Sequence, residues 1–273
     1  MNTKFLSLII VALSLTCLGI YLFVSAPPPL DLNVSKVNKS YSTENAFKII
    51  AKLNDDTRTF YTKEIVGKGM ASGLKFHEDW QKSNVEAGPL PALFLRGIAQ
   101  YIEKSAVPMG LYLGSDFPIV QANLFEGVQA EKFKEIKKDK KPKFFYDTDT
   151  DRHIGMFPDF AGAQACVTCH NEHKDSPKKN WKLNDMMGAT TWSYPTDSIS
   201  TDELLAMISI YKNGVKNTYT SYITEVNGFK STIKPNVGNN WPSQGYNIPS
   251  WNTLSDTIDL MTSKALMTSI LNK

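Results

Sequence analysis

The sequence predicts an α+β protein in which antiparallel strands and flanking helices follow an N-terminal transmembrane helix. Three observations predict this class. A long apolar run opens the chain. Several later segments place apolar residues at three- and four-residue steps, which is typical of amphipathic helices. Short apolar or aromatic runs lie between them without regular strand–helix alternation, which favours an antiparallel sheet over a parallel one.

The first segment, residues 1–26, is expected to be a membrane anchor or signal segment. Lys4 gives it a basic start, and Phe5–Val24 carries no charged residue. At about 1.5 Å per residue, this run is long enough to cross the hydrocarbon core of a bilayer, about 30 Å thick. The basic start predicts a cytoplasmic N-terminus and an exported remainder. Small residues before Ala26 also fit a cleaved signal peptide, but the length of the run and the prolines after it favour an uncleaved anchor.

Residues 27–41 form a proline-rich, then polar linker. We expect helices over 42–66, 90–102, 124–138 and 201–225, and strands over 110–120, 144–146 and 188–194. A serine–threonine pair starts each of the two longest helices, at Ser42 and Ser200, where a hydroxyl oxygen can accept from the free N–H groups of the first turn. We therefore divide the exported part into a main domain, 42–199, and a C-terminal helical appendage, 200–273.

The most specific signal in the chain is Cys166-Val167-Thr168-Cys169-His170. In a Cys-x-x-Cys-His segment, the two thiols can add across the two vinyl groups of one porphyrin, and the imidazole can bind the iron. A thioredoxin-like pair would need a βαβ context. A zinc site would need a second ligand pair, and the remaining cysteine, Cys17, lies in the apolar run. With three cysteines so placed there is no disulfide framework, and one covalent haem c is predicted.

The segment around this motif, from Asp159-Phe160 to Trp181-Lys182, resembles a family of bacterial c-type haem domains with a PAS-like fold. That family comprises periplasmic sensor regions of cyclases, histidine kinases and chemoreceptors, and also stand-alone cytochromes. Weaker similarities extend over most of 46–195, among them Val66-Gly67-Lys68 and Ser115-Asp116-Phe117-Pro118. The resemblance implies a PAS-like antiparallel sheet with flanking helices, attachment of the haem through Cys166 and Cys169, and His170 as the proximal iron ligand.

The sixth iron ligand is left open by the sequence. In some members of that family a cysteine upstream of the haem motif is the sixth ligand, and no such cysteine is present here. Many members also continue into an output domain, whereas this chain ends at Lys273. The candidates are His77, which would give a bis-His haem, Met70 and Met109, whose thioethers would raise the reduction potential, His153, and water. His173 follows His170 too closely to reach the opposite face.

Other residues are expected around the haem. Trp181 is assigned to the porphyrin edge, and Lys178 to the haem propionates, a role for which Lys179 and Arg96 are also chemically suited. The lysine-rich run over 132–143 could dock an acidic redox partner or lie near anionic headgroups, although such runs are more often a solvated helix face. A net charge of +3 with 21% charged residues gives no indication of nucleic-acid binding.

Together these features predict a single-pass inner-membrane protein whose haem domain faces the periplasm. The expected function is that of a monohaem c-type cytochrome in electron transfer or redox signalling, with a separate redox or signalling partner. The alternative is a haem-based redox or gas sensor that reports to another protein. A sensor should have an exchangeable sixth ligand, whereas a simple carrier usually has two protein ligands. No catalytic constellation is recognisable, so an enzyme is not expected.

Overall fold

The computed structural model describes residues 3–25 and 40–271 of the 273-residue chain. The chain divides into two units, Met1–Asn38 and Lys39–Lys273. The linker expected over 27–41 falls almost entirely outside the described residues.

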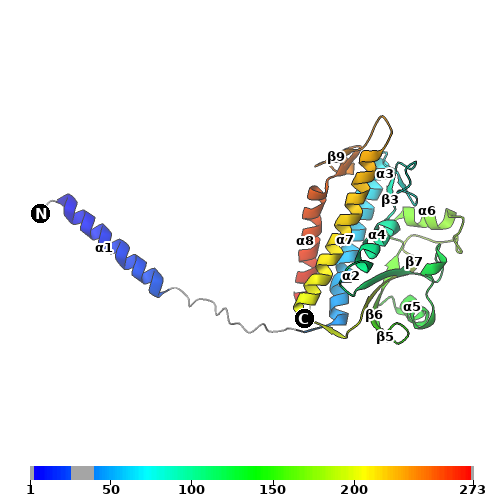
Figure 1. Cartoon of the computed structure of the whole chain (residues 1–273), viewed down its shortest axis with the longest axis horizontal. Helices are drawn as coiled ribbons and strands as arrows, with labels where there is room; N and C mark the ends of the chain where they lie inside the picture. Colours follow the sequence, from blue (N-terminus) through cyan, green and yellow to red (C-terminus); the bar gives the residue numbers. More distant parts are fainter. Residues whose placement is uncertain (1–2, 26–39, 272–273) are drawn as a thin grey trace. The chain divides into compact units, whose positions relative to one another are not determined.

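The first unit contains α1 (Thr3–Val24), drawn in dark blue in Figure 1. Among the residues that the structure describes, no helix meets the length and apolarity that a membrane span requires. The transmembrane helix expected within residues 1–26 is therefore not supported by the structure and stays a prediction.

An antiparallel four-stranded sheet lies in the second unit, in the spatial order β4-β7-β6-β5. Its strands are β4 (Gly110–Gly114), β5 (Lys143–Asp147), β6 (Arg152–Phe160) and β7 (Met186–Tyr194). α2 (Thr43–Phe60) packs on one face of this sheet and α5 (Gly127–Asp139) on the other. With helices on both faces, β7 is buried along nearly its whole length. The mixed α+β class is confirmed, and a PAS-like fold stays a prediction.

The expected strands correspond to β4, β5 and β7, but β6 was not predicted. The segment that became β6 contains Gly155 and Pro158, two residue types that weaken a strand pattern. Gly155 is required here by close packing, because a Cβ at this position would lie 2.7 Å from the Phe47 ring of α2. β6 ends in a register shift at Asp159/Phe160, which turns the chain out of the sheet towards the segment with the cysteines.

α2 begins after Ser42, whose hydroxyl oxygen accepts a hydrogen bond from the Asn45 N–H at 3.3 Å. The helix continues through a π-helical segment, Tyr61–Gly67, into α3 (Lys68–Ala71), so the predicted helix is confirmed. In the π-helical segment, Tyr61 stacks on Phe94 of α4 (Pro91–Glu103) with ring centroids 4.0 Å apart. Its hydroxyl also donates to the Pro89 carbonyl at 2.7 Å. These contacts hold α4 against α2.

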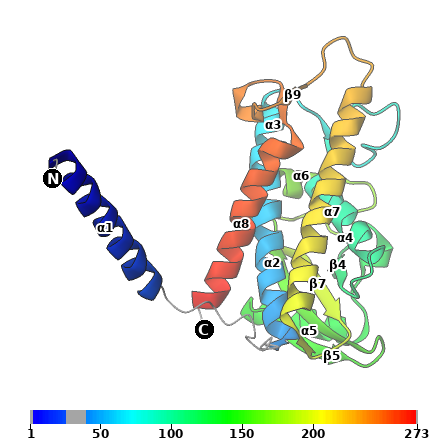
Figure 2. The same ribbon diagram turned by 60° about the vertical axis from the view of Figure 1, so that its left-hand side comes forward.

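Two long helices, α7 (Thr201–Gly228) and α8 (Trp251–Leu271), run beside α2 in both views (Figures 1 and 2). They share one core with α2, α4 and the sheet. Its fully buried large side chains include Trp192, Tyr211, Tyr219, Tyr222, Phe47 and Phe94. Residues 200–273, which we expected as an appendage, thus contribute to the same core as the residues before them.

Short pairings flank these elements: β1 (Tyr41–Ser42) with β8 (Ser198–Ile199), β2 (Phe76–His77) with β3 (Gly88–Pro89), and β9 (Asn236–Gly238) with β10 (Asn247–Pro249). Two 3-10 turns cover Gln121–Asn123 and Pro242–Gln244. The pairing of β2 with β3 is parallel and leads the chain into α4.

Candidate functional site

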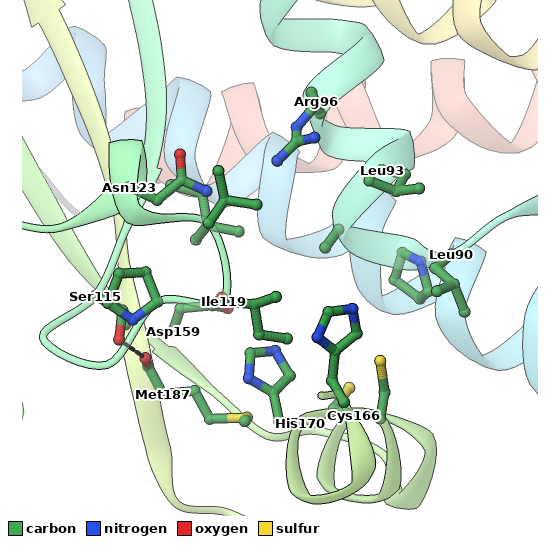
Figure 3. Close-up of a pocket in the computed structure, with 18 of the residues that line it drawn as sticks. Leu90, Leu93, Arg96, Ser115, Ile119, Asn123, Asp159, Cys166, His170 and Met187 are labelled. Atoms are coloured by element: carbon green, nitrogen blue, oxygen red, sulfur yellow. Dashed lines mark hydrogen bonds between the residues drawn. The ribbon is translucent and has the colours of Figure 1, made fainter. Parts of the chain in front are cut away.

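The cysteine–histidine motif lies on a short helix, α6 (Gln164–Glu172). Positions separated by three and four residues share one face of a helix, so Cys166, Cys169 and His170 are brought together by the local fold alone. All three line a cavity of about 380 Å³ (Figure 3). The two cysteines are free thiols and partly buried. The structure thus brings the three reactive groups of the motif to one cavity, and their role in haem attachment stays a prediction.

The walls of this cavity are mainly apolar. Leu90 is the N-cap residue of α4, and Leu93 lies in the first turn of this helix. Ile119 and Val120 come from the loop after β4. Met187 of β7 closes the side next to α6, and its carbonyl accepts a hydrogen bond from the Ser115 hydroxyl at 2.5 Å (Figure 3). A cavity of this kind suits a flat, largely apolar ligand that contacts the face of α6 on which the two thiols lie.

A partly buried ion pair borders the cavity where the sheet meets α2. The Arg58 guanidinium donates two hydrogen bonds to the Asp159 carboxylate, at 2.9 and 3.2 Å, and a third to the Thr190 hydroxyl at 3.3 Å. Burial by itself lowers the pKa of Arg58, but the charge and hydrogen bonds of Asp159 outweigh it, and the pKa is raised. Arg58 is therefore a permanent cation whose charge is compensated at the cavity wall.

His170 is held as a neutral imidazole. Burial lowers its pKa, His173 lowers it further, and Asp159 opposes the shift. Its Nδ1 atom is buried and has no hydrogen-bond partner among the described residues. A neutral ring is the form that binds a metal, and an unpartnered buried ring nitrogen in an apolar wall marks a site prepared for a further group.

The two thiols are held in their neutral form. Burial is the main cause that raises the pKa of both Cys166 and Cys169. Neutral thiols at this position are stable against adventitious metal binding and disulfide exchange, which both require the thiolate. Two thiols, a neutral imidazole and an apolar cavity together fit a covalently held haem.

Trp181 packs beneath α6 and does not line the cavity. It is 4% exposed, clusters with Ala161, Val167 and Met187, and meets the His170 ring edge-on with centroids 6.4 Å apart. Its backbone exchanges hydrogen bonds with the Asn171 side chain at 2.9 and 3.0 Å. Trp181 therefore supports His170 from below.

Lys178 covers the outer side of this tryptophan. Its Nζ lies 3.6 Å from the Trp181 ring centroid and 5.6 Å from that of Phe117, and the residue does not line the cavity. The structure thus gives Lys178 a cation–π contact, whereas a contact with haem propionates stays a prediction.

The residues proposed as sixth ligand lie elsewhere. His77 is exposed, and its Nδ1 accepts from the Asp79 N–H at 3.0 Å. Met70 is 53% exposed, and Met109 is 3% exposed within the core formed by the helices. His153 stands on β6, where its ring lies 5.1 Å from that of Tyr146. None of these four lines the cavity in the described structure.

His173 does line the cavity, and its Nε2 lies 3.1 Å from a Glu78 oxygen. It is the C-cap residue of α6. The other polar residues of the cavity, Arg58 and Asn123 among them, were not singled out for it. They come from elements far apart in the chain, and no local spacing connects them to the motif.

The described residues contain no group of three or more His, Cys, Asp or Glu side chains arranged to hold a bare metal ion. A haem iron does not call for one, since the porphyrin supplies four nitrogens and the protein supplies only axial ligands.

A helix that presents two thiols and a neutral imidazole to an apolar cavity is the arrangement expected of a c-type haem-binding domain. Comparison with protein-family models agrees with this class. The Tll0287-like family matches residues 38–195, which is more than half of the chain, and the protein belongs to this family of periplasmic c-type haem domains. No curated protein and no solved structure matches the chain.

Proposed function

We propose that the protein is a membrane-anchored periplasmic c-type cytochrome that carries one covalent haem and acts in electron transfer or redox signalling. The observation that carries this proposal is the common cavity face of Cys166, Cys169 and His170 on α6. When bound, the haem supplies reversible one-electron chemistry at its iron. Cys166 and Cys169 would hold the haem, His170 would bind its iron, and the apolar walls would limit the access of water.

Haem attachment is tested by mass and spectrum. In cells with working cytochrome c maturation, the purified protein is expected to carry the mass of one haem and to give the pyridine haemochrome of a thioether-linked haem. Cys166→Ala and Cys169→Ala should each lower covalent haem content by tenfold or more. Cys17→Ala is the matched control, because Cys17 lies in α1 and outside the cavity. A bare polypeptide mass from the wild-type chain would refute the proposal.

The proposed location follows from the chemistry of attachment and from the apolar N-terminal run. Haem ligation through Cys-x-x-Cys-His takes place on the exported side of bacterial membranes, and Phe5–Val24 would tether the domain there. Cell fractionation and N-terminal sequencing test both points. Recovery in the soluble periplasm with a new N-terminus near Pro27 would show that the run is a cleaved signal.

A second function, a haem-based redox or gas sensor that signals to a partner protein, is favoured by one observation. The cavity is not lined by His77, Met70 or Met109. In the described structure, none of these three expected sixth ligands therefore lies beside the haem motif. Rapid CO binding to the ferrous protein would support the sensor. Six-coordinate low-spin spectra in both oxidation states, inert to CO, would support the carrier.

A further inference from the structure

The wall of the cavity that faces α6 carries two polar side chains, Arg96 and Asn123. Figure 3 shows Arg96 on α4 and Asn123 at the end of the loop after β4, both turned towards the cavity, with His170 and Cys166 on the other side. Leu93 and Ile119 lie between them and α6 in the same view. The wall is therefore apolar except for one guanidinium and one amide.

Arg96 differs from the other charged residues at this cavity in having no partner. Asp159 pairs with Arg58 at 2.9 Å, Glu78 with His173 at 3.1 Å, and Asp79 with Lys82 at 3.0 Å. In the part of the chain that the structure describes, Arg96 makes no ion pair, and no side-chain hydrogen bond of Asn123 occurs. A guanidinium without an ion-pair partner and an amide with free N–H groups that line the same cavity can together bind an anion.

The same wall offers no group that binds iron. The lining residues that could do so, apart from the motif, are Glu78, Asp79, Asp159, His173 and Met187. The first four make the side-chain contacts just described, and Met187 packs beside α6 with Val167 and Trp181. Leucine, isoleucine, arginine and asparagine side chains remain on the far wall, and such side chains donate hydrogen bonds or exclude water without coordinating a metal.

We infer that Arg96 and Asn123 bind a small anion at the cavity wall opposite α6, and that this anion would be an exchangeable ligand of an iron held by His170. This inference rests on the proposed haem function and makes it more specific. Arg96, an exposed residue, would supply charge and a hydrogen bond to the anion, Asn123 would supply a second N–H, and Leu93 and Ile119 form the apolar surface beside them. The ligand class is a small, linear or bent monoanion of the azide or nitrite type.

Azide is the probe, and imidazole is the neutral comparison. The ferric holoprotein is titrated at pH 8, and each Kd is read from the Soret shift. Arg96→Gln is expected to weaken azide binding about tenfold, the effect of losing one charge-assisted hydrogen bond, and to change imidazole binding less than about twofold. Arg96→Lys should fall between wild type and Arg96→Gln. Asn123→Asp, which places a negative charge on the wall, should also weaken azide binding.

Lys104→Gln is the matched control, because it removes one positive charge just after α4 from a residue that does not line the cavity. Its azide affinity should equal that of the wild type. Equal azide affinity in wild type, Arg96→Gln and Asn123→Asp would overturn the inference, as would an attached haem that binds neither azide nor imidazole. Haem content by pyridine haemochrome is measured on every sample, so a failure of attachment is distinguished from a failure of anion binding.

Discussion

The helical side of the domain and the cavity side are built differently. α7 buries a continuous stripe of large side chains, including Tyr211, Tyr219 and Tyr222, against α2, α4 and the sheet. α6, by contrast, buries only Val167 within its own length, and the small cluster to which Val167 belongs contains four buried residues. The cavity side relies on polar pairs at its borders, such as Arg58 with Asp159.

This difference separates stability from ligand binding. Most of the buried apolar surface lies in the core shared by the four helices and the sheet, and it does not involve α6. The helix that carries the haem ligands is instead lightly packed and begins at Ala163 without a side-chain cap. We therefore expect the domain to fold without haem and α6 to gain most of its order on attachment, since ligands stabilise the state that binds them.

The largest expected effect tests this separation directly. Trp192→Ala removes a fully buried indole that packs against Tyr211 and should lower the free energy of unfolding by about 3–5 kcal/mol. Val167→Ala, in the small cluster under α6, should cost well below about 2 kcal/mol, the full burial energy of two methyl groups, because α6 is little ordered before haem attachment. Urea titrations of the haem-free domain, followed by circular dichroism, give both values. A larger loss for Val167→Ala than for Trp192→Ala would reverse the comparison.

The ion pair at the cavity border should have an intermediate effect. The side chains of Arg58 and Asp159 are 16% and 21% exposed, so breaking the pair should cost less than the loss of about 3–5 kcal/mol known for fully buried pairs. We expect Asp159→Asn to lower the free energy of unfolding by about 2 kcal/mol, because it leaves the Arg58 charge buried without compensation.

The double variant Arg58→Met with Asp159→Asn is the control for this pair. It removes both charges, so it should be less destabilised than the sum of the two single variants. Strict additivity in the double-mutant cycle would show that the two side chains do not stabilise the cavity border through each other.

The sequence predicted the parts of the site that lie close together in the chain. Cys166, Cys169 and His170 form their face through helical spacing alone, and this could be recognised before any fold was known. The opposite wall was predicted less well. Arg96 was named only as a residue suited to the haem propionates, and Asn123 was not named, because the packing of separate elements brings the two to one cavity. Met70 and His77 were named as possible iron ligands from their residue types, but they do not line the cavity. Residue type alone does not give a position in the fold.

The fold was predictable to a similar extent. α2 and α7 followed from periodicity and from the serines at their starts, Ser42 and Ser200, whereas α8 (Trp251–Leu271) is longer than the short helix expected near the end of the chain. β6 was missed because its glycine and proline obscure the strand pattern, although a tertiary contact with Phe47 requires the glycine. The sequence of α7 also could not show to which core the helix belongs. Its buried residues recur with the same period whether the helix packs on a neighbouring domain or forms part of the main core.

The smallest expected effect on the free energy of unfolding concerns the N-terminal caps of α7 and α2. Ser200 and Glu203 form a capping box at α7: the Glu203 N–H donates to the Ser200 hydroxyl oxygen at 3.2 Å, and the Ser200 N–H donates to the Glu203 carboxylate at 2.7 Å. Ser42 caps α2 through one hydrogen bond only. Ser200→Ala should lower the free energy of unfolding by about 1 kcal/mol and Ser42→Ala by less, as measured in urea at pH 7.

The capping box also predicts a pH dependence that the simple cap lacks. Hydrogen bonds from the Ser200 N–H and hydroxyl hold the pKa of Glu203 below its ordinary value of 4.5, and the Tyr194 hydroxyl adds to this. The unfolded chain therefore binds a proton at a higher pH than the folded one. The stabilisation is complete above that ordinary value and is lost as the pH falls through the lower, folded pKa. Ser200→Ala should accordingly cost less at pH 3 than at pH 7, whereas the cost of Ser42→Ala should stay constant. An unchanged cost for Ser200→Ala at both pH values would mean that the Glu203 carboxylate does not support the start of α7.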